Sequence, residues 1–361
     1  MSPAPARPGA GGPSSSPPRI RAVASAVPEH SLPQAEMRRF AQGFFAADLP
    51  ALPRMLEVFE NAAIDARQLV RPIAWYATPR SFPEKNAVYV EEVVALSERA
   101  AQRALAAAKI DPAELGAIVF VTSTGVATPS LDCVLVQRLD LPRTIARVPL
   151  WGLGCAGGAA GLARAATLCQ GLGRAVLLVC AEACSVTFVH ADQSKSNLVA
   201  TALFGDGAAA AVLAPGGEGP AVLGGFSRLL DDSADVMGWT LRESGLQVRF
   251  APRIPEIVRR TVPEVVAEVL GDYGLRREQV TRFVMHPGGA KVLTAYDEAL
   301  DLAPGQLDHA RAVLREHGNM SSPTVLFVLE RVLAEPPPHD GVGLLMGLGP
   351  GFCAEGAVLR W

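Results

Sequence analysis

Cys155 stands at a position where a cysteine could act as a nucleophile. An apolar, strand-like segment, Ile145 to Leu150, precedes it, and small residues lead from it into a helix that begins near Ala159. The first backbone N–H groups of a helix lack internal partners and carry partial positive charge, so this position favours the thiolate. Glycines on both sides leave room for a substrate to reach the sulfur. The alternative is an inert cysteine that packs as a small hydrophobic residue.

His286 has the context that best suits a partner for that thiol. It ends a buried strand, Thr281 to Met285, and a Pro-Gly-Gly turn follows it. Open α/β sheets place their active sites at the carboxyl ends of strands. A cysteine nucleophile needs a base or an ion-pair partner, which a histidine supplies. The alternative is a structural histidine that caps the turn.

Asn319 lies in a turn between two expected helices, in the run His-Gly-Asn-Met-Ser-Ser-Pro from 317 to 323. Its amide could donate a hydrogen bond to a reacting carbonyl, although turn geometry alone also favours asparagine. Ser322 is a good N-cap for the helix that follows, and Pro323 suits the first helical position.

Strands and helices alternate in both halves of the chain, which predicts a layered α/β architecture. A Pro- and Gly-rich linker at 215–220 divides an N-terminal half, 19–215, which holds Cys155, from a C-terminal half, 221–361, which holds His286 and Asn319. Residues 1–18 are rich in Pro, Gly, Ser and Ala, and we expect a disordered leader there rather than a signal peptide. The expected strands are 19–27, 117–121, 175–181, 208–213, 221–226, 280–285, 342–346 and 357–359, and the expected helices are 34–46, 53–63, 90–109, 255–270, 306–317 and 322–333.

The composition is that of a well-buried globular enzyme. Of 361 residues, 49% are hydrophobic and 19% are charged, and the formal net charge of -3 with no basic stripe argues against a nucleic-acid partner. No apolar run is long enough to span a bilayer. The six cysteines are scattered without a Cys-x-x-Cys pair, which predicts reduced thiols in the cytoplasm and no metal site.

Five short motifs occur in one order along the chain and together closely resemble type III polyketide synthases, the chalcone synthase-like branch of the thiolase-fold condensing enzymes. The resemblance covers roughly Ile20 to Trp361. It implies a thiolase-like fold, with two similar layered α/β halves and the active site between them. The motifs are Gly-Cys-Ala-Gly-Gly from 154, Leu-Phe-Gly-Asp-Gly-Ala-Ala from 203, His-Pro-Gly-Gly from 286, Gly-Asn-Met-Ser-Ser from 318 and Gly-Leu-Gly-Pro-Gly from 347.

The resemblance implies a reaction sequence for the three candidate residues. Cys155 takes an acyl group from an acyl-CoA, and His286 is the ion-pair partner of its thiolate. His286 and Asn319 then stabilise the enolate that malonyl-CoA leaves on losing CO2, and this carbanion attacks the Cys155 thioester. The family requires no metal, flavin or carrier-protein group, and the resemblance also implies a homodimer.

Several further positions bear on the substrate. Phe204 matches the family's gating phenylalanine, whereas Val248 stands where a second gating phenylalanine is expected. Trp239 occupies a cavity position that is glycine in plant chalcone synthases. Cys184 replaces a plant threonine, and this small thiol resembles bacterial alkylpyrone and alkylresorcinol synthases. The other expected substrate-binding residues are Thr187, Ser321 and Arg54, the last of which matches one basic residue of the plant CoA-phosphate site.

We therefore expect a bacterial-type synthase that condenses malonyl-CoA onto a long-chain fatty acyl-CoA and gives alkylpyrones or alkylresorcinols. The alternative within the family is a malonyl-primed 1,3,6,8-tetrahydroxynaphthalene synthase. Outside it, the alternatives are an enzyme like ketoacyl-acyl carrier protein synthase III and a non-catalytic acyl-binding homologue. The intact Cys155, His286 and Asn319 argue against the last of these.

Overall fold

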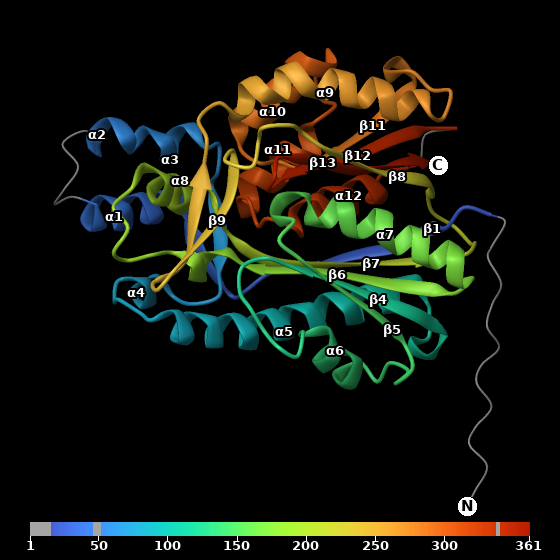
Figure 1. Ribbon diagram of the computed structural model, residues 1–361, viewed down its shortest axis with the longest axis horizontal. Helices are drawn as coiled ribbons and strands as arrows, with labels where there is room; N and C mark the ends of the chain where they lie inside the picture. Colours follow the sequence, from blue (N-terminus) through green and yellow to red (C-terminus); the bar gives the residue numbers. More distant parts are fainter. Residues whose placement is uncertain (1–15, 46–51, 337–339) are drawn as a thin grey trace, which may run out of the picture.

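Helices and sheets alternate in five layers. The structure, a computed structural model, describes residues 16–45, 52–336 and 340–361. Figure 1 shows helix α5 below an N-terminal sheet, helices α7 and α12 in the middle, a C-terminal sheet above them, and helices α9 and α10 on the outside. The layered α/β architecture expected from the sequence is confirmed.

The N-terminal sheet is buried on both faces. Its central strands carry continuous runs of buried residues rather than alternating ones, as expected for a sheet with helices on each side. Strand β4 is parallel to both β5 and β6, and β7 is antiparallel to β6 and β1. In spatial order the strands are β1 (Arg19–Ala26), β7 (Asp206–Ala214), β6 (Ala175–Ala183), β4 (Leu115–Thr122) and β5 (Ala146–Trp151).

The C-terminal sheet continues from the N-terminal one. Strand β8 meets β1 at a single pair, Arg19 and Ala221, so the two sheets share one nine-stranded order. Strand β12 is parallel to β11 and antiparallel to β13, which pairs with β8. The strands are β8 (Ala221–Leu229), β13 (Cys353–Arg360), β12 (Val342–Gly349) and β11 (Val280–Met285).

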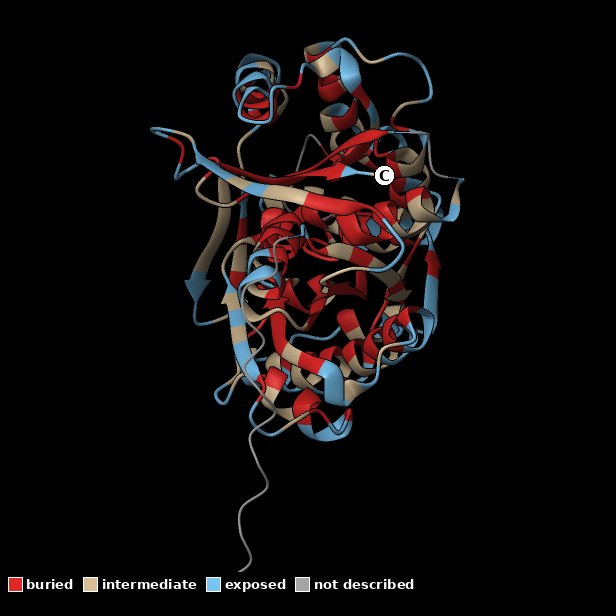
Figure 2. Ribbon diagram, turned by 90° about the vertical axis from the view of Figure 1, so that its right-hand side faces the viewer, coloured by how far each residue is buried: buried red, intermediate tan, exposed pale blue. Residues whose placement is uncertain are grey.

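Helices cover both outer faces and fill the space between the sheets. Figure 2 shows a buried interior of strands and middle helices, whereas the outermost helices expose one side to solvent; β5 and most of β8 are exposed or half-buried. Among the described residues, no helix combines the length and apolar content needed to cross a membrane. The layer helices are α5 (Phe82–Ala108), α6 (Asp132–Arg138), α7 (Gly157–Leu172), α9 (Ile254–Gly271), α10 (Ala290–Leu300), α11 (Asp308–His317) and α12 (Thr324–Ala334).

A group of short elements packs at one end of the layers and has a hydrophobic cluster of its own. Helix α8 belongs to it, and the β9–β10 hairpin lies against α8. The elements are β2 (His30–Pro33), α1 (Gln34–Phe44), α2 (Leu52–Met55), α3 (Glu57–Asn61), β3 (Ala66–Leu69), α4 (Ile73–Tyr76), α8 (Lys195–Leu203), β9 (Met237–Arg242) and β10 (Gly245–Phe250), and single turns of 3-10 helix lie at Pro112–Glu114, Gly154–Ala156, Cys184–Thr187 and Arg277–Gln279.

The observed boundaries differ most from the expected ones at two helices and at the last strand, which was expected at 357–359 and runs Cys353–Arg360 as β13. The helix expected at 53–63 is two short helices, α2 and α3, separated at Leu56. Helix α5 begins at Phe82 rather than 90, because Ser81 and Glu84 form a capping box at its start. The linker at 215–220 joins β7 to β8, and the division into two halves stays a prediction. Most of the expected leader, 1–18, lies outside the described residues.

Candidate active site

Cys155 lies at the junction of a strand and a helix, as the sequence predicted. Strand β5 ends at Trp151, and a single 3-10 turn that contains Cys155 leads directly into α7. The Gly154 N–H, one residue earlier, donates to the Ser123 hydroxyl at 3.1 Å. The Cys155 side chain is buried, with 6% of its surface exposed. The thiol is therefore held at the start of a buried helix.

His286 follows β11, at the end of the neighbouring sheet. Its backbone N–H donates to the carbonyl of Met346 at 2.9 Å, and its ring is buried. Neither ring nitrogen has a hydrogen-bond partner in the structure. Buried polar atoms are normally paired, so these two nitrogens are candidates for contact with a ligand.

Gly347 lies between Cys155 and His286. A Cβ added there would stand 3.0 Å from the Cys155 carbonyl oxygen and 3.5 Å from the Cβ of His286. A side chain at 347 would therefore press on the Cys155 backbone, because 3.0 Å is tighter than an ordinary van der Waals contact, and would be in ordinary contact with His286. The motif Gly-Leu-Gly-Pro-Gly thus has a packing reason, since it lets the two halves of the site approach.

Asn319 completes the group. Its Nδ2 lies 3.7 Å from the Cys155 sulfur and donates to the Gly288 carbonyl at 3.3 Å. Its Oδ1 accepts from the Ser321 N–H at 2.8 Å, which orients the amide. Cys155, His286 and Asn319 come from three different segments: Asn319 contacts the Cys155 sulfur and the backbone of Gly288, two residues after His286, and Gly347 lies beside both Cys155 and His286.

Burial opposes a charge on either titratable residue. It raises the pKa of Cys155 to about 11, although hydrogen bonds from Asn319 and Ser321 lower the value in part. It also lowers the pKa of His286 to about 3. The helix start does not by itself favour the thiolate here, because desolvation outweighs the field of the helix. A thiolate–imidazolium pair, in which each charge offsets the burial of the other, stays a prediction.

Glu182 is a buried carboxylate that the sequence analysis missed. Its Oε1 accepts from the Ser322 hydroxyl at 2.7 Å, and its Oε2 accepts from the Ser123 N–H at 2.8 Å and the Thr124 hydroxyl at 2.7 Å. Burial raises the pKa of Glu182 to about 7 despite these donors. It therefore ties β6 to the loop after β4 and to the loop that carries Asn319. The feature of the sequence that could have identified Glu182 is that it is the one acidic residue within the apolar run of β6.

The residues expected at the cavity form one cluster. Phe204, Cys184 and Val248 pack together, and Trp239 lies against them with its ring 6.3 Å from that of Phe204. Burial raises the pKa of Cys184 well above its usual range, and Cys155 is near enough to contribute to that rise. The cluster is therefore adjacent to the candidate nucleophile.

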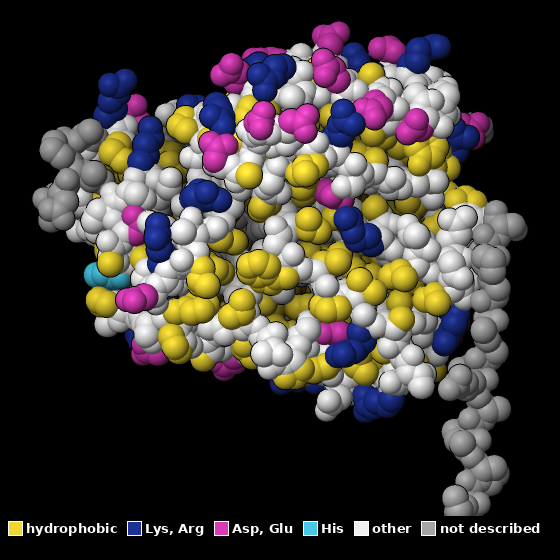
Figure 3. Space-filling view, viewed as in Figure 1, with side chains coloured by type: hydrophobic (Ala, Val, Ile, Leu, Met, Phe, Trp, Pro, Cys, Tyr) yellow, Lys and Arg dark blue, Asp and Glu magenta, His cyan; other side chains and the backbone are white. Residues whose placement is uncertain are grey.

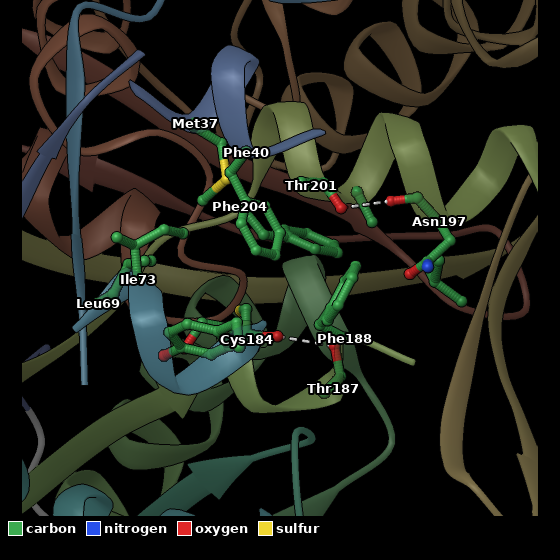
Figure 4. Close-up of a pocket in the computed structure, with 14 residues that line it drawn as sticks. Met37, Phe40, Leu69, Ile73, Cys184, Thr187, Phe188, Asn197, Thr201 and Phe204 are labelled. Atoms are coloured by element: carbon green, nitrogen blue, oxygen red, sulfur yellow. Dashed lines mark hydrogen bonds between the residues drawn. The ribbon is translucent and has the colours of Figure 1, made fainter. Parts of the chain in front are cut away.

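A small cavity of about 40 Å³ opens beside this cluster. Figure 4 shows Phe204, Phe188 and Cys184 around the same space. Its polar atoms are few, and the volume is enough for about three water molecules. The lining residues are Met37, Phe40, Leu69, Ile73, Tyr76, Cys184, Ser185, Thr187, Phe188, Asn197, Ala200, Thr201, Phe204 and Val248.

The remaining expected residues are less central. The Thr187 hydroxyl lines the cavity and donates to the Cys184 carbonyl at 2.7 Å. Ser321 is buried beside Asn319 and has a positive φ of 60°. Arg54 is exposed on α2, outside the group around Cys155. Among the described residues, no group of His, Cys, Asp and Glu side chains could hold a metal ion.

Comparison with known structures shows that this layered fold is that of the thiolase-like condensing enzymes. The crystal structure of 1,3,6,8-tetrahydroxynaphthalene synthase from Streptomyces coelicolor A3(2), a bacterial type III polyketide synthase, superposes with a TM-score of 0.91 at 30% identity. The match covers 95% of this chain and 99% of that one. The expected fold class is confirmed.

Sequence comparison then defines the family. The N-terminal domain of chalcone and stilbene synthases matches residues 14–217, and the C-terminal domain matches 224–361. The chain therefore belongs to the chalcone and stilbene synthase family and is a type III polyketide synthase. Enzymes of this family are acyltransferase-type condensing enzymes that use CoA thioesters without a cofactor.

Three relatives are similar over nearly the whole chain. A putative chalcone synthase of Bacillus subtilis is 38% identical, covering 95% of this chain and 98% of its own. The 1,3,6,8-tetrahydroxynaphthalene synthase of Streptomyces peucetius is 38% identical, with coverage of 95% and 93%. The alpha-pyrone synthesis polyketide synthase-like Pks18 of Mycobacterium tuberculosis is 30% identical, with coverage of 94% and 90%.

Proposed function

We propose that Cys155 carries the growing chain, that His286 takes part in both loading and decarboxylation, and that Asn319 acts on malonyl-CoA. The observation that carries this proposal is the contact of the Asn319 amide with the Cys155 sulfur at 3.7 Å, in a buried site where Gly347 separates Cys155 from His286 and both nitrogens of His286 are unpartnered. A nucleophile with a base and an amide donor beside it is the arrangement that acyl transfer needs.

The loading step begins from the ion pair of the Cys155 thiolate and the His286 imidazolium. The thiolate attacks the carbonyl carbon of the acyl-CoA thioester, and the CoA thiolate that leaves takes the proton from His286. Burial disfavours each charge alone, whereas forming the thiolate and the imidazolium together lets each stabilise the other. The product is an acyl thioester on Cys155 and free CoA thiol.

The extension step uses the same donors. Hydrogen bonds from His286 and Asn319 to the malonyl thioester oxygen stabilise the enolate that remains after CO2 leaves. The enolate carbon attacks the acyl carbon on Cys155, and the Cys155 thiolate is released as the new carbon–carbon bond forms. The chain, now longer by two carbons, is attached to CoA and can reload.

We infer that the starter is a long-chain fatty acyl-CoA and that the products are alkylpyrones or alkylresorcinols. The cavity is lined by Phe204, whose backbone bridges to that of Asn319, and not by Cys155 itself; apolar side chains make up most of its wall, which includes the small residues Cys184 and Ala200. A volume of about 40 Å³ is too small for a long acyl tail, so this proposal requires the surrounding side chains to move apart. The similarity to the alpha-pyrone synthesis polyketide synthase-like Pks18 supports the pyrone product.

A malonyl-primed 1,3,6,8-tetrahydroxynaphthalene synthase is the second candidate. Its support is the small volume of the cavity together with 38% identity to the Streptomyces peucetius enzyme of that name. Incubation with malonyl-CoA alone separates the candidates, because only the malonyl-primed enzyme forms product without a second acyl-CoA. Mass spectrometry of the products from a panel of acyl-CoA starters then gives starter length and the number of extensions.

We also propose that the enzyme is a homodimer that pairs near β5. Strand β5 ends the sheet and has a neighbour on one side only. Trp151 on this strand is 54% exposed and Val126 is 46% exposed, which is unusual for large hydrophobic side chains. Figure 3 shows hydrophobic side chains gathered across the face that bears β5 and α6. A second copy would cover this surface.

Two further proposals concern the substrate's headgroup and the location of the enzyme. Arg54 is exposed at the end of the molecule that carries α1 and α8, and we propose that it binds a CoA phosphate. Replacing it with alanine should raise KM for acyl-CoA without changing kcat.

All six cysteines are free, which supports a location in the reducing cytoplasm.

A further inference from the structure

Arg67 is a fully buried cation that does not touch the substrate cavity. It lies on β3, and none of its surface is exposed. Its Nη1 donates to the carbonyls of Thr201 at 2.9 Å and Phe204 at 3.1 Å, and its Nη2 donates to the carbonyl of Ala202 at 2.8 Å. One guanidinium therefore binds three backbone carbonyls of a single segment.

That segment is the carboxyl end of helix α8. The last carbonyls of a helix have no partners within the helix and carry partial negative charge. A planar guanidinium with several donors is suited to bind a group of them together. Helix α8 ends at Leu203, so Arg67 supplies hydrogen-bond donors to the carbonyls at this end.

Gln34 supports the same arrangement from α1. Its Oε1 accepts a hydrogen bond from Arg67 Nη2. Its Nε2 donates to the carbonyls of Ala202 and Phe59, each at 3.2 Å. The guanidinium is thus held in place by a second buried side chain, and the two together fix the end of α8 to the short elements around it.

The end of α8 also reaches two residues of the active site. The Phe204 side chain lines the cavity. The Asn319 N–H donates to the Leu203 carbonyl at 2.9 Å, and the Gly205 N–H donates to the Asn319 carbonyl at 3.0 Å. The segment that Arg67 holds therefore fixes both the cavity wall and the backbone of Asn319.

The backbone at Gly205, just after the end of α8, is closely packed against its neighbours. A Cβ added to Gly205 would stand 2.3 Å from the His317 carbonyl oxygen and 3.3 Å from the Cβ of Arg67. Burial lowers the pKa of Arg67 to about 9, while the carboxylate of Asp206 favours the charged form. Among the ion pairs of the described residues Arg67 has none, so the carbonyls of α8 are its main partners.

We propose that Arg67 is a positioning residue of the condensing reaction, which holds the end of α8 so that Asn319 and Phe204 keep their places relative to Cys155. This inference rests on the proposed function. It assigns Arg67 no contact with the substrate. Its effect passes through the backbone of Leu203 and Gly205 to Asn319, and so should fall mainly on the step that uses the Asn319 amide.

The test compares two half-reactions in the full-length enzyme. Starter loading is followed by intact mass of the acyl-enzyme, and malonyl-CoA decarboxylation is followed by release of CO2. Arg67→Met should lower decarboxylation about ten- to a hundred-fold more than loading, because small displacements of a positioned group cost about that much. Arg67→Lys should recover part of the loss, since an ammonium can still donate to up to three carbonyls.

Arg99→Met is the matched control. Arg99 donates to a single backbone carbonyl, that of Val27 at 2.7 Å, from helix α5 on the outer face of the N-terminal sheet. Its ratio of decarboxylation to loading should stay at the wild-type value. If Arg67→Met does not fold, Gln34→Leu and Arg67→Lys decide the question, and each should lower the same ratio.

Two outcomes are distinguishable. If the wild-type enzyme does not decarboxylate malonyl-CoA, the proposed function itself fails. If the wild type does so, but the folded Arg67 and Gln34 variants lose both half-reactions equally and only in step with a lowered Tm, Arg67 is a structural residue and the inference is overturned.

Discussion

Phe204 and Asn319 pair through their backbones in a short parallel bridge. Two motifs that lie more than a hundred residues apart in the sequence are thereby joined, one that supplies a wall of the cavity and one that supplies the amide beside Cys155. The cavity wall and the Asn319 amide are consequently joined through one backbone bridge, so a change at either is expected to affect the other.

Replacing Asn319 with alanine should damage decarboxylation more than starter loading. The amide donates to an enolate that exists only in the malonyl half-reaction, and the loss of one such donor costs about 3–4 kcal/mol. Acyl-enzyme should still accumulate on Cys155, as measured by intact mass, while CO2 release stalls. Equal loss of the two half-reactions would mean that Asn319 mainly supports the junction with Phe204.

Replacing His286 with alanine should raise the pH at which Cys155 reacts. Burial, offset in part by hydrogen bonds from Asn319 and Ser321, places the pKa of Cys155 at about 11, above its ordinary value, so the thiolate is disfavoured until the pH approaches that value. The proposed imidazolium would lower it, and its removal should return the thiol to the buried value. The measurement is the rate of iodoacetamide labelling of Cys155 against pH. Identical profiles in wild type and His286→Ala would exclude the ion pair.

Enlarging Cys184 should shorten the acyl tail that the enzyme accepts. Each methylene buried along an apolar wall contributes about 0.8 kcal/mol, so a blocked channel removes several kcal/mol from long starters only. Cys184→Phe should therefore lose activity with starters of a dozen or more carbons and keep it with short ones, and Cys184→Ala should accept both. A uniform loss across the starter panel with a lowered Tm would indicate overpacking and would favour the malonyl-primed alternative.

A charge on the exposed face of β5 should dissociate the proposed dimer. Trp151→Glu places a carboxylate where an apolar side chain would otherwise be covered by a second copy. Light scattering should then report one chain where the wild type reports two. The substitution Leu241→Glu is a control, because Leu241 is also exposed but lies on the β9–β10 hairpin. A wild-type monomer would contradict the proposal.

The sequence predicted the layers and the three central residues because both leave local signals. Strand β11 was predicted with its observed bounds from one apolar run, and Cys155 stood out by its glycine-rich surroundings. Arg67 and Glu182 left weaker signals, since an isolated charged residue in a sequence shows neither its burial nor its partners. Only the tertiary structure places Arg67 at the end of α8.

The sequence also could not predict the ionisation state of Cys155. The start of a helix favours a thiolate, and that effect was visible from the chain alone. The opposing cost of burial depends on how the two sheets and α7 close around the sulfur, and it is the larger effect. The sequence likewise could not explain why Phe204 is followed by Gly205. Only the structure shows that the backbone of Phe204 bridges to that of Asn319.

The most direct test of the central claim is to locate the acyl group on the enzyme. The full chain is incubated with an acyl-CoA starter, and intact mass with peptide mapping identifies the modified residue before malonyl-CoA is added. The account predicts one acyl group on Cys155, its disappearance on addition of malonyl-CoA as the extended product forms, and no condensation by Cys155→Ala. An acyl group on Cys184 or Cys353, with continued turnover by Cys155→Ala, would contradict it.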